Sequence, residues 1–254
     1  DTMATDAIYI IAIGAIVAGF IQGLSGFAFS MVSMSFWVWV LDPRLAATLA
    51  VFGALTGQIL SAFSVRKGFN LQLLWPFIAG GLLGIPMGVA VLPHLNMEWF
   101  KAIFGALLVV WCSVMLFAKH LPAFTAGGRI ADGIVGVAGG VMGGIGGLTG
   151  PVPTLWCVIR GYDRDAQRSI IQNFNLSMLM ITMITYLATG IVTSDMLPMF
   201  ALVLPTMLIP TLLGARFYKK INDTTFRKVV LTLLTVSGIS LLVSSVPRLL
   251  EPLI

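Results

Sequence analysis

The sequence predicts an all-α membrane protein with about ten helical segments in two inverted repeats, and short broken or re-entrant helices at the start of each repeat. Hydrophobic residues make up 58% of the 254 residues and charged residues only 10%, whereas soluble domains average about 45–50% and about 25%. The charges are clustered, so the chain has long uncharged stretches, such as that between Asp6 and Asp42. Each stretch has room for at least one membrane-spanning helix of about 20 residues. This composition excludes soluble enzymes, nucleic-acid-binding modules and secreted disulfide frameworks.

Charged residues, prolines and glycines divide the first half of the chain into five apolar segments. The uncharged stretch after Asp6 is interrupted at Gly23-Leu24-Ser25-Gly26, which separates a long first segment from a short second one. The third segment follows Arg44, and the fifth ends before Lys119. The predicted segments are residues 7–23, 27–41, 45–65, 71–93 and 98–118.

The second half divides in the same way. Its first segment follows Arg129 and ends in the cluster Gly143-Gly144-Ile145-Gly146-Gly147, and a short segment then runs to Arg160. The predicted segments are residues 130–147, 150–160, 165–190, 195–217 and 225–247. Each short segment follows a glycine-bearing break. Because lipid cannot satisfy a broken backbone, both breaks are predicted to lie inside the bundle, against protein or water.

Lys and Arg side chains predict how the chain sits in the membrane. Twelve of them lie in or beside the connections after the third, fifth, seventh and ninth segments, and three lie on the opposite side. Since cytoplasmic loops carry the excess of Lys and Arg, the protein is predicted to be a multi-pass inner (plasma) membrane protein with both termini outside the cytoplasm. The twelve are Arg66, Lys67, Lys119, Arg129, Arg160, Arg164, Arg168, Arg216, Lys219, Lys220, Arg227 and Lys228; the three are Arg44, Lys101 and Arg248.

A sparse internal repeat relates the two halves. A shift of 120 positions places Ala18-Gly19 on Ala138-Gly139 and Arg44 on Arg164, and it aligns the glycines of the two breaks. Each unit contains an odd number of crossings, so the second copy must insert upside down, as in many secondary transporters. The predicted division is residues 1–120 for the first repeat, 121–129 for a cytoplasmic linker and 130–254 for the second repeat.

Two inverted breaks would bring the starts of the short helices together near the middle of the bilayer. Ser25 is a predicted N-cap of the second segment, and Thr149 is its counterpart for the seventh, where Pro151 suits a first helical turn. A helix start offers unpaired N–H groups and about half a positive charge, so two of them would bind an anion without a buried Lys or Arg. Close helix packing is the alternative explanation of the glycines.

Polar residues of the eighth segment add candidate donors. Gln172 and Asn175 share a helix face, and Asn173 lies on another; one face would line a pathway and the other would bind neighbouring helices. Thr56 and Gln58 lie at a comparable level of the third segment. The predicted substrate-binding residues are Ser25, Gly26, Phe27, Ser30, Gly146, Gly147, Thr149, Gly150, Pro151, Gln172, Asn173 and Asn175.

Arg164 and Arg168 lie one turn apart at the cytoplasmic start of the eighth segment. They are either vestibule residues that attract an anion or topology anchors.

No phosphate-binding loop and no His/Glu cluster with metal spacing is present in the sequence. The sequence therefore predicts no use of ATP, no metal and no other cofactor. The two cysteines, Cys112 and Cys157, lie in apolar runs and are interpreted as packing residues. Together these features favour a transporter over an enzyme.

The stretch from Gly143 to Pro153, followed by Arg160-Gly161-Tyr162-Asp163, resembles the second-half signature of the TauE/SafE sulfite exporters, also called the toluene sulfonate uptake permease family. The first-half stretch Gly19 to Phe29 is similar to its weaker partner. The resemblance implies transport of sulfite, sulfonates or related sulfur-containing organic anions. The first break lacks the paired glycines of the second and has Phe27 and Phe29 instead, so an aromatic wall against an organic substituent becomes plausible.

The sequence therefore predicts a secondary transporter of small sulfur-containing anions, working by alternating access around a site at the two helix starts. Two transport alternatives are a permease for small carboxylates and an anion channel; a membrane scaffold without a transported ligand is a third alternative. The predicted partners are a small anionic substrate, the lipid bilayer and a possible second copy of the chain, with no nucleic acid.

Overall fold

The computed structural model describes residues 2–64, 69–120, 122–218 and 220–251. These residues form ten α-helices, which confirms the ten predicted segments. In the first half the helices are α1 (Thr2–Ser25), α2 (Phe29–Trp37), α3 (Pro43–Ser64), α4 (Leu71–Val91) and α5 (Met97–Phe117). In the second half they are α6 (Gly128–Gly146), α7 (Pro151–Arg160), α8 (Arg164–Ala188), α9 (Leu197–Phe217) and α10 (Asp223–Leu250). Three short 3₁₀ turns are Leu92–His94, Ala118–His120 and Ser194–Met196.

Seven of the described helices are long and apolar enough to cross a membrane, namely α1, α3, α4, α5, α8, α9 and α10. The helices α2 and α7 have 9 and 10 residues, and the glycine-rich α6 has 19. At about 1.5 Å per residue, α2 and α7 reach only about half-way across a hydrocarbon core of about 30 Å. The prediction of two short helices, each after a glycine break, is confirmed.

The second segment is shorter than predicted. The apolar run extends from 27 to 41, but α2 begins at Phe29 and ends at Trp37, and Val38–Leu41 form a turn. Val38 and Leu41 are nevertheless buried. Their hydrophobicity reflects burial in the bundle and not helix length, which is why the apolar pattern overestimates the helix.

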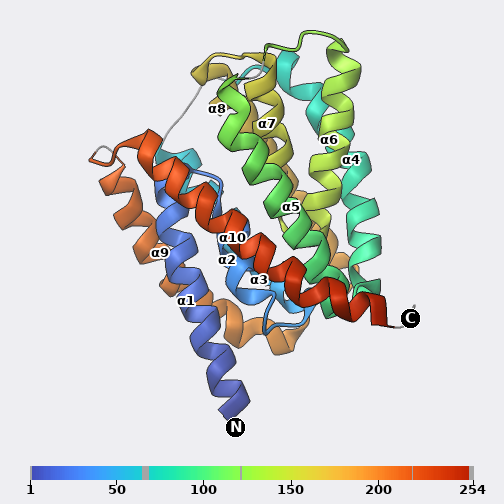
Figure 1. Ribbon diagram of the computed structural model, residues 1–254, viewed down its shortest axis with the longest axis vertical. Coiled ribbons are helices and arrows are strands. Elements are labelled where there is room, and N and C mark those ends of the chain that lie inside the picture. The colour runs from blue at the N-terminus through green and yellow to red at the C-terminus, as the bar shows by residue number, and fades with distance from the viewer. Residues whose placement is uncertain (1, 65–68, 121, 219, 252–254) are drawn as a thin grey trace.

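Two pairs of long helices form the flanks of the bundle. The helix α4 packs along α6 on one side, and α1 packs along α9 on the other, while α5 packs along α10 and α3 along α8 (Figure 1). The helix α1 begins, and α10 ends, at the same end of the molecule, the lower end in Figure 1. The residues of the α6–α7 break, from Gly146 to Pro151, are buried as predicted, whereas at the α1–α2 break Ser25 is exposed and Gly26 and Phe27 are half-buried.

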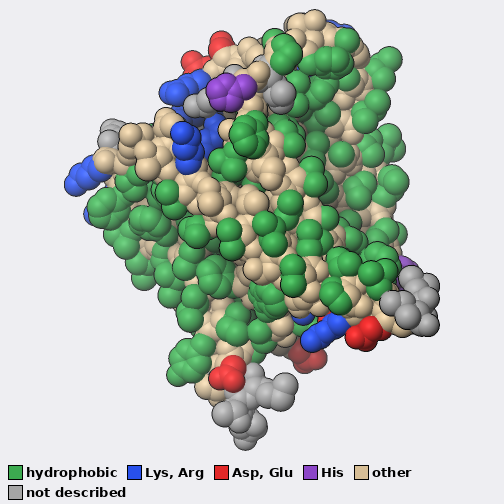
Figure 2. All heavy atoms as spheres, in the orientation of Figure 1, with side chains coloured by type: hydrophobic (Ala, Val, Ile, Leu, Met, Phe, Trp, Pro, Cys, Tyr) green, Lys and Arg blue, Asp and Glu red, His purple; other side chains and the backbone are tan. Residues whose placement is uncertain are grey.

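The surface is typical of a protein surrounded by lipid. Large apolar side chains such as Leu83, Ile184 and Val243 are 60% exposed or more, and hydrophobic side chains cover the middle of the molecule in Figure 2. Most of the Lys and Arg side chains visible in that view lie at the upper end, opposite the start of α1. Of the residues counted in the charge asymmetry, Arg66, Lys67 and Lys219 lie outside the described residues.

A buried ion pair ties the two arms of the second break together. The carboxylate Oδ1 of Asp132 on α6 accepts a hydrogen bond of 2.7 Å from the indole Nε1 of Trp156 on α7, and it lies 3.5 Å from Nη2 of Arg160 at the end of α7. The Asp132 and Arg160 side chains are each only 9% exposed. The Arg160 guanidinium also donates to the carbonyls of Thr125 and Gly128 at 2.9 Å. This network holds the start of α6 against the end of α7.

Replacing Asp132 with asparagine is expected to destabilise the protein by about 3 kcal/mol, because it leaves the buried Arg160 guanidinium without its counter-charge. Thermal unfolding of the detergent-purified protein measures the effect. Arg44, whose side chain is exposed, gives the matched control: Arg44→Gln is expected to change the free energy of unfolding by less than about 0.5 kcal/mol. Equal stability of the Asp132→Asn and Arg44→Gln variants would show that the network does not brace the second break.

Candidate functional site

A cavity of about 470 Å³ lies beside the first break. Residues from both halves of the chain line it, on α1, the α1–α2 connection, α2, α3, α5, α7, α8, α9 and α10. Tyr218 and Phe226, on either side of the connection between α9 and α10, belong to its wall. The cavity therefore reaches the end of the bundle at which α9 ends and α10 begins.

The walls combine cations and amides with a large apolar surface. Arg168 on α8 and Arg227 on α10 are its two charged residues, and the described lining contains no Asp or Glu. Gln58, Gln167 and Gln172 supply amide groups. The apolar part of the wall comprises Ile21, Leu24, Phe27, Ala28, Met31, Leu60, Trp111, Met115, Val158, Ile171, Leu212, Ala215, Phe226, Val230, Leu231 and Leu234. Such a cavity suits an anion that carries an apolar body.

Two glutamine side chains form hydrogen bonds to the backbone of the first break. The helix α1 ends at Ser25, and Gly26 follows with φ +85°, a left-handed conformation that favours glycine. The Gly26 carbonyl accepts two amide hydrogen bonds, from Gln22 Nε2 at 3.0 Å and from Gln58 Nε2 at 2.6 Å. Gln22 Oε1 in turn accepts from the backbone N–H of Phe29, the first residue of α2, at 3.0 Å.

Ser25 is not the N-cap of α2, which corrects the sequence prediction. The N-cap is Ala28, and its side chain makes no cap bond. The Ser25 hydroxyl oxygen instead accepts from the N–H groups of Phe27 and Ala28, at 3.4 and 3.3 Å. Since Gln22 accepts from Phe29, three N–H groups at this helix start are already engaged by side chains of the protein. At this break the groups left to bind a ligand in the cavity are therefore mainly side chains, because side chains of the protein already occupy these backbone N–H groups.

The second break has a different construction. The helix α6 ends at Gly146, and its C-cap is Gly147, which has φ +73° and donates its N–H to the Gly143 carbonyl at 2.7 Å. Gly150, and not Thr149, is the N-cap of α7, and no side chain caps it. Pro151 lies at the first position, as predicted, but Pro153 lies in the same turn. Because proline has no N–H, only Val152 among the first three residues of α7 carries a backbone donor.

Thr149 is used in the interior of the protein. It is 1% exposed, and its hydroxyl donates to Oδ1 of Asn175 on α8 at 3.0 Å. The indole of Trp111 on α5 donates to the Pro151 carbonyl at 2.6 Å. These two bonds fix the start of α7 against α5 and α8, and they explain why a threonine beside the helix start does not serve as its cap.

The two breaks lie against each other. A methyl group built on Gly150 would lie 3.2 Å from the ring of Phe27, and one built on Gly147 would lie 3.0 Å from the hydroxyl of Ser30. The rings of Phe27 and Trp111 meet edge to face, with 6.4 Å between centroids. Both rings line the cavity, so they separate it from the buried start of α7.

The structure distributes the predicted residues over three places. The cavity wall contains Ser25, Gly26, Phe27, Arg168 and Gln172. The buried contact behind the wall contains Ser30, Gly146, Gly147, Thr149, Gly150, Pro151 and Asn175. Asn173 donates to the Ser169 carbonyl of its own helix at 2.8 Å, and Arg164 is exposed at the start of α8, outside the described lining.

The residues at this site that did not enter the predicted set include Gln22, Gln58, Trp111 and Arg227. A signal for Gln22 exists in the sequence, since an amide inside an apolar run is costly unless it is paired. The sequence offers no comparable signal for Arg227, because a cation at a helix start is equally well explained by membrane topology. Trp111 is one of six tryptophans in the sequence, and nothing in the sequence marks it as a site residue; its bond to the Pro151 carbonyl is seen only in the structure.

A second hollow, of about 610 Å³, lies between the starts of α4 and α8. Its lining includes the carboxylates of Asp163 and Asp165. Asp163 is the N-cap of α8 and accepts from the Ala166 N–H at 2.7 Å. Negative charge in its wall makes this hollow a poorer anion site than the cavity beside the first break.

Comparison with known proteins identifies the family. The family model described as sulfite exporter TauE/SafE matches residues 11–241, which include both breaks and every residue that lines the cavity, Arg227 among them. No curated protein and no solved structure gives a significant match. The matched residues extend over most of the 254-residue chain. The chain therefore belongs to the TauE/SafE sulfite exporter family, whose members are membrane transporters of sulfite- and sulfonate-type anions and not enzymes.

Proposed function

We propose that the protein transports organic sulfonates through the cavity beside the first break. The observation that carries the proposal is the composition of the wall: two arginines and several amides, no described carboxylate, and a predominantly apolar remainder. A volume of about 470 Å³ lies within the range of about 300–1,000 Å³ that is usual for small-molecule sites. Bare sulfite would leave most of the apolar wall without a contact.

A sulfonate would use both parts of the wall. Its oxygens would accept hydrogen bonds from the guanidinium groups of Arg168 and Arg227 and from the Ser25 hydroxyl, whose oxygen accepts from two backbone N–H groups and whose proton is a further donor. Its organic body would lie against Phe27, Trp111 and the neighbouring aliphatic side chains. In this proposal the buried contact of the two breaks, which includes Thr149, Gly150 and Asn175, supports the wall and does not itself hold the anion.

We propose further that the two halves are inverted repeats that move against each other in alternating access. The helices of each half follow the order long, short, long, long, long. The packing of α1 on α9 corresponds to that of α6 on α4 when the halves are exchanged, and the pairs α5–α10 and α3–α8 correspond to themselves. The repeats are residues 1–120 and 130–254; residue 121 of the linker 121–129 lies outside the described residues.

Glycine contacts support the same correspondence. A methyl group built on Gly88 of α4 would lie 2.1 Å from the Val141 carbonyl oxygen of α6, and one built on Gly214 of α9 would lie 2.2 Å from the Phe20 carbonyl oxygen of α1. Each glycine thus admits the backbone of the first helix of the other repeat. The cavity reaches the end of the bundle that is rich in Lys and Arg, which the positive-inside rule makes cytoplasmic, so the structure would be an inward-facing state with both termini outside.

Competition for transport in proteoliposomes tests this function. The purified protein is expected to take up radiolabelled toluenesulfonate with saturable kinetics. Unlabelled toluenesulfonate should compete at least about tenfold more strongly than methanesulfonate or sulfite, because tenfold needs about 1.4 kcal/mol, which burial of only about 55 Å² of the aromatic body supplies at about 25 cal/mol per Å². The matched carboxylate, toluate, should compete less than toluenesulfonate, since it has the same body but one oxygen fewer for the arginines.

Each other outcome favours a specific alternative. Equal competition by toluate and toluenesulfonate would favour a carboxylate permease, and strongest competition by sulfite would favour a site for the bare anion. Flux that does not saturate would favour a channel. Absence of any flux of sulfonate, sulfite or carboxylate would contradict transport of these anions.

A further inference from the structure

The starts of α5 and α10 carry the same residue pattern. Each helix is preceded by an asparagine that caps it: Asn96 Oδ1 accepts from Trp99 N–H at 2.8 Å, and Asn222 Oδ1 accepts from Thr224 N–H at 3.1 Å. The fourth residue of each helix is a phenylalanine and the fifth is a cation. The pairs are Phe100-Lys101 on α5 and Phe226-Arg227 on α10.

The two cations lie at opposite ends of the bundle. The helices α5 and α10 pack along each other, and they approach closely at Gly105 and Gly238, where a methyl group built on either would lie 2.9 Å from the carbonyl oxygen of the other. Arg248 near the end of α10 bonds to Glu98 at the start of α5 at 3.2 Å. The helices are therefore antiparallel, and Lys101 lies at the end where α1 begins and α10 ends (Figure 1).

The surroundings of the two cations differ. In a transporter that is open to one side of the membrane, a residue on that side is accessible and its counterpart on the other side is covered. Phe226 and Arg227 line the cavity. Phe100 and Lys101 are buried, at 3% and 6% exposure. The same helix position is thus open to a ligand at one end of the molecule and covered at the other.

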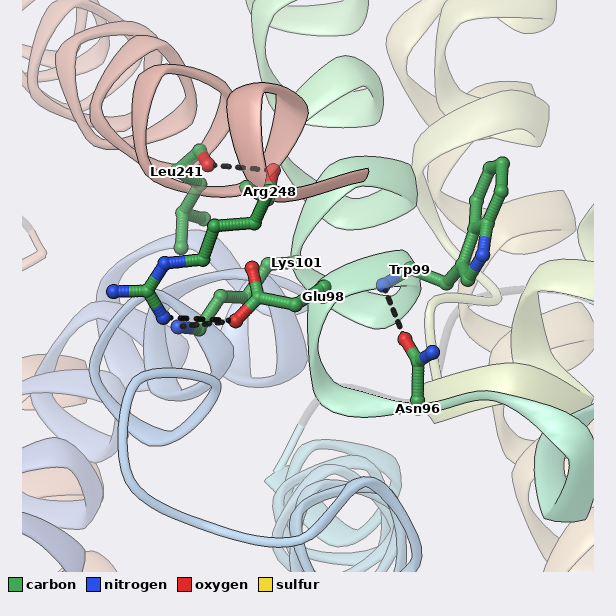
Figure 3. A network of polar contacts seen from close by, with 7 residues as sticks. Asn96, Glu98, Trp99, Lys101, Leu241 and Arg248 are labelled. Carbon is green, nitrogen blue, oxygen red and sulfur yellow. Dashed lines mark hydrogen bonds and ion pairs between the residues drawn. The ribbon is translucent and has the colours of Figure 1, made fainter. Parts of the chain in front are cut away.

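The cover over Lys101 is a small polar cluster (Figure 3). The Lys101 ammonium lies 3.9 Å from Glu98 Oε1 and 5.2 Å from the centroid of the Trp39 ring. The Arg248 guanidinium lies 3.2 Å from the same carboxylate oxygen, and its side chain is 63% exposed. The other oxygen of this carboxylate, Oε2 of Glu98, is buried and has no hydrogen-bond partner among the residues that the structure describes. One carboxylate therefore faces two cations with half of its acceptor capacity unused.

We propose that Lys101 is an anion-binding residue of the outward-facing state and takes there the part that Arg227 takes in the present cavity. This proposal rests on the proposed transport by alternating access. Separation of Trp39, which follows the short helix α2, and of the Arg248–Glu98 pair would uncover the ammonium at the opposite side of the membrane. A buried ammonium is costly unless it is paired. Its ion pair with Glu98 is long, at 3.9 Å, so an approaching substrate anion would replace this contact at small cost.

The decisive measurement compares substrate affinity on the two sides of the membrane. Initial rates of toluenesulfonate transport are measured in right-side-out and inside-out membrane vesicles. With Lys101→Gln, the half-saturation concentration should rise about tenfold when substrate is presented on the Lys101 side, the size expected for one charged contact, and change less than twofold on the Arg227 side. Arg227→Gln should show the reverse, and Lys101→Arg, which keeps the charge, should remain close to the wild-type protein.

Chemical labelling gives an independent readout. In a variant with Cys112→Ser, Cys157→Ser and Lys101→Cys, a membrane-impermeant thiol reagent added on the Lys101 side should react, and toluenesulfonate on that side should slow the reaction. Attachment of an aminoethyl group to this cysteine restores a cation and should restore the lower half-saturation concentration. A purely structural lysine would give none of this substrate protection.

The outcomes separate the two proposals. A wild-type protein that does not transport toluenesulfonate contradicts the proposed function. Wild-type transport together with equal effects of Lys101→Gln on both sides, or labelling without substrate protection, overturns the role of Lys101 alone. Size-exclusion chromatography of each variant establishes that the comparison is made on folded protein.

Discussion

Exchange of Gln22 for leucine is expected to abolish transport and to lower the free energy of unfolding by about 1.5–4.5 kcal/mol. Gln22 is 1% exposed, and its amide joins both sides of the first break: Oε1 accepts from the Phe29 N–H, and Nε2 donates to the Gly26 carbonyl. Leucine has a similar volume but makes neither bond. It would leave the buried Phe29 N–H without a partner, at a cost of about 1–3 kcal/mol, and it would remove one of the two bonds to the half-buried Gly26 carbonyl, at about 0.5–1.5 kcal/mol.

The expected loss of transport follows from the position of Gln22 beside the cavity wall. Ser25, Gly26 and Phe27 all belong to the cavity wall, and the Gln22 bonds set the direction in which the chain turns from α1 into α2. Without them the wall would not keep its shape, even in protein that remains folded. Uptake of radiolabelled toluenesulfonate and thermal unfolding are measured on the same preparation.

Gln72→Leu is the matched control. Gln72 is also a glutamine on a long helix, but its side chain is exposed at the start of α4. This change is expected to retain transport and to alter stability by less than about 0.5 kcal/mol. If Gln22→Leu transports as well as Gln72→Leu, the first break does not depend on the glutamine bridge, and the proposed wall loses its support.

The features that the sequence predicts well are local ones. Hydropathy and charge spacing locate all ten helices, and the glycines locate both breaks, because each signal lies in neighbouring residues. Two helix ends are exceptions: α1 begins at Thr2 and not at residue 7, and α2 ends at Trp37 although apolar residues continue to Leu41. Hydrophobicity reports burial, and a buried turn is as apolar as a buried helix.

The features that the sequence does not predict depend on which distant groups meet. Ser25 and Thr149 precede helix starts and are the cap candidates that the sequence offers, but Ser25 is the last residue of α1, three positions before the N-cap Ala28, and the Thr149 hydroxyl is bonded elsewhere. Thr149 donates to Asn175, which is 26 positions away in the sequence. The amide that reaches the start of α2 comes from Gln22, seven positions before Phe29. No spacing rule links these residues, because helix packing brings them together.

The change Gly84→Ala is expected to destabilise the protein by about 3 kcal/mol, although it adds a single methyl group. The methyl carbon would lie 2.2 Å from the Val137 carbonyl oxygen of α6. Its neighbour is backbone, so no side chain can rotate away, and the two helices must separate. In a membrane, association of helices depends on close packing because lipid is as apolar as the side chains it replaces. Overpacking of this kind costs about 1–3 kcal/mol or more.

The same methyl group at Gly133, on the facing helix of the same interface, provides the control. There it would meet only the Pro76 carbonyl oxygen, at 3.7 Å, an ordinary van der Waals contact. Because alanine favours a helix over glycine by about 1 kcal/mol, Gly133→Ala is expected to leave stability unchanged or raised, opposite in sign to Gly84→Ala. Thermal unfolding in detergent compares the two. Equal stability of both variants would mean that α4 and α6 lie farther apart than this structure places them, and the correspondence between the α4–α6 and α1–α9 contacts, which supports the inverted repeats, would lose its basis.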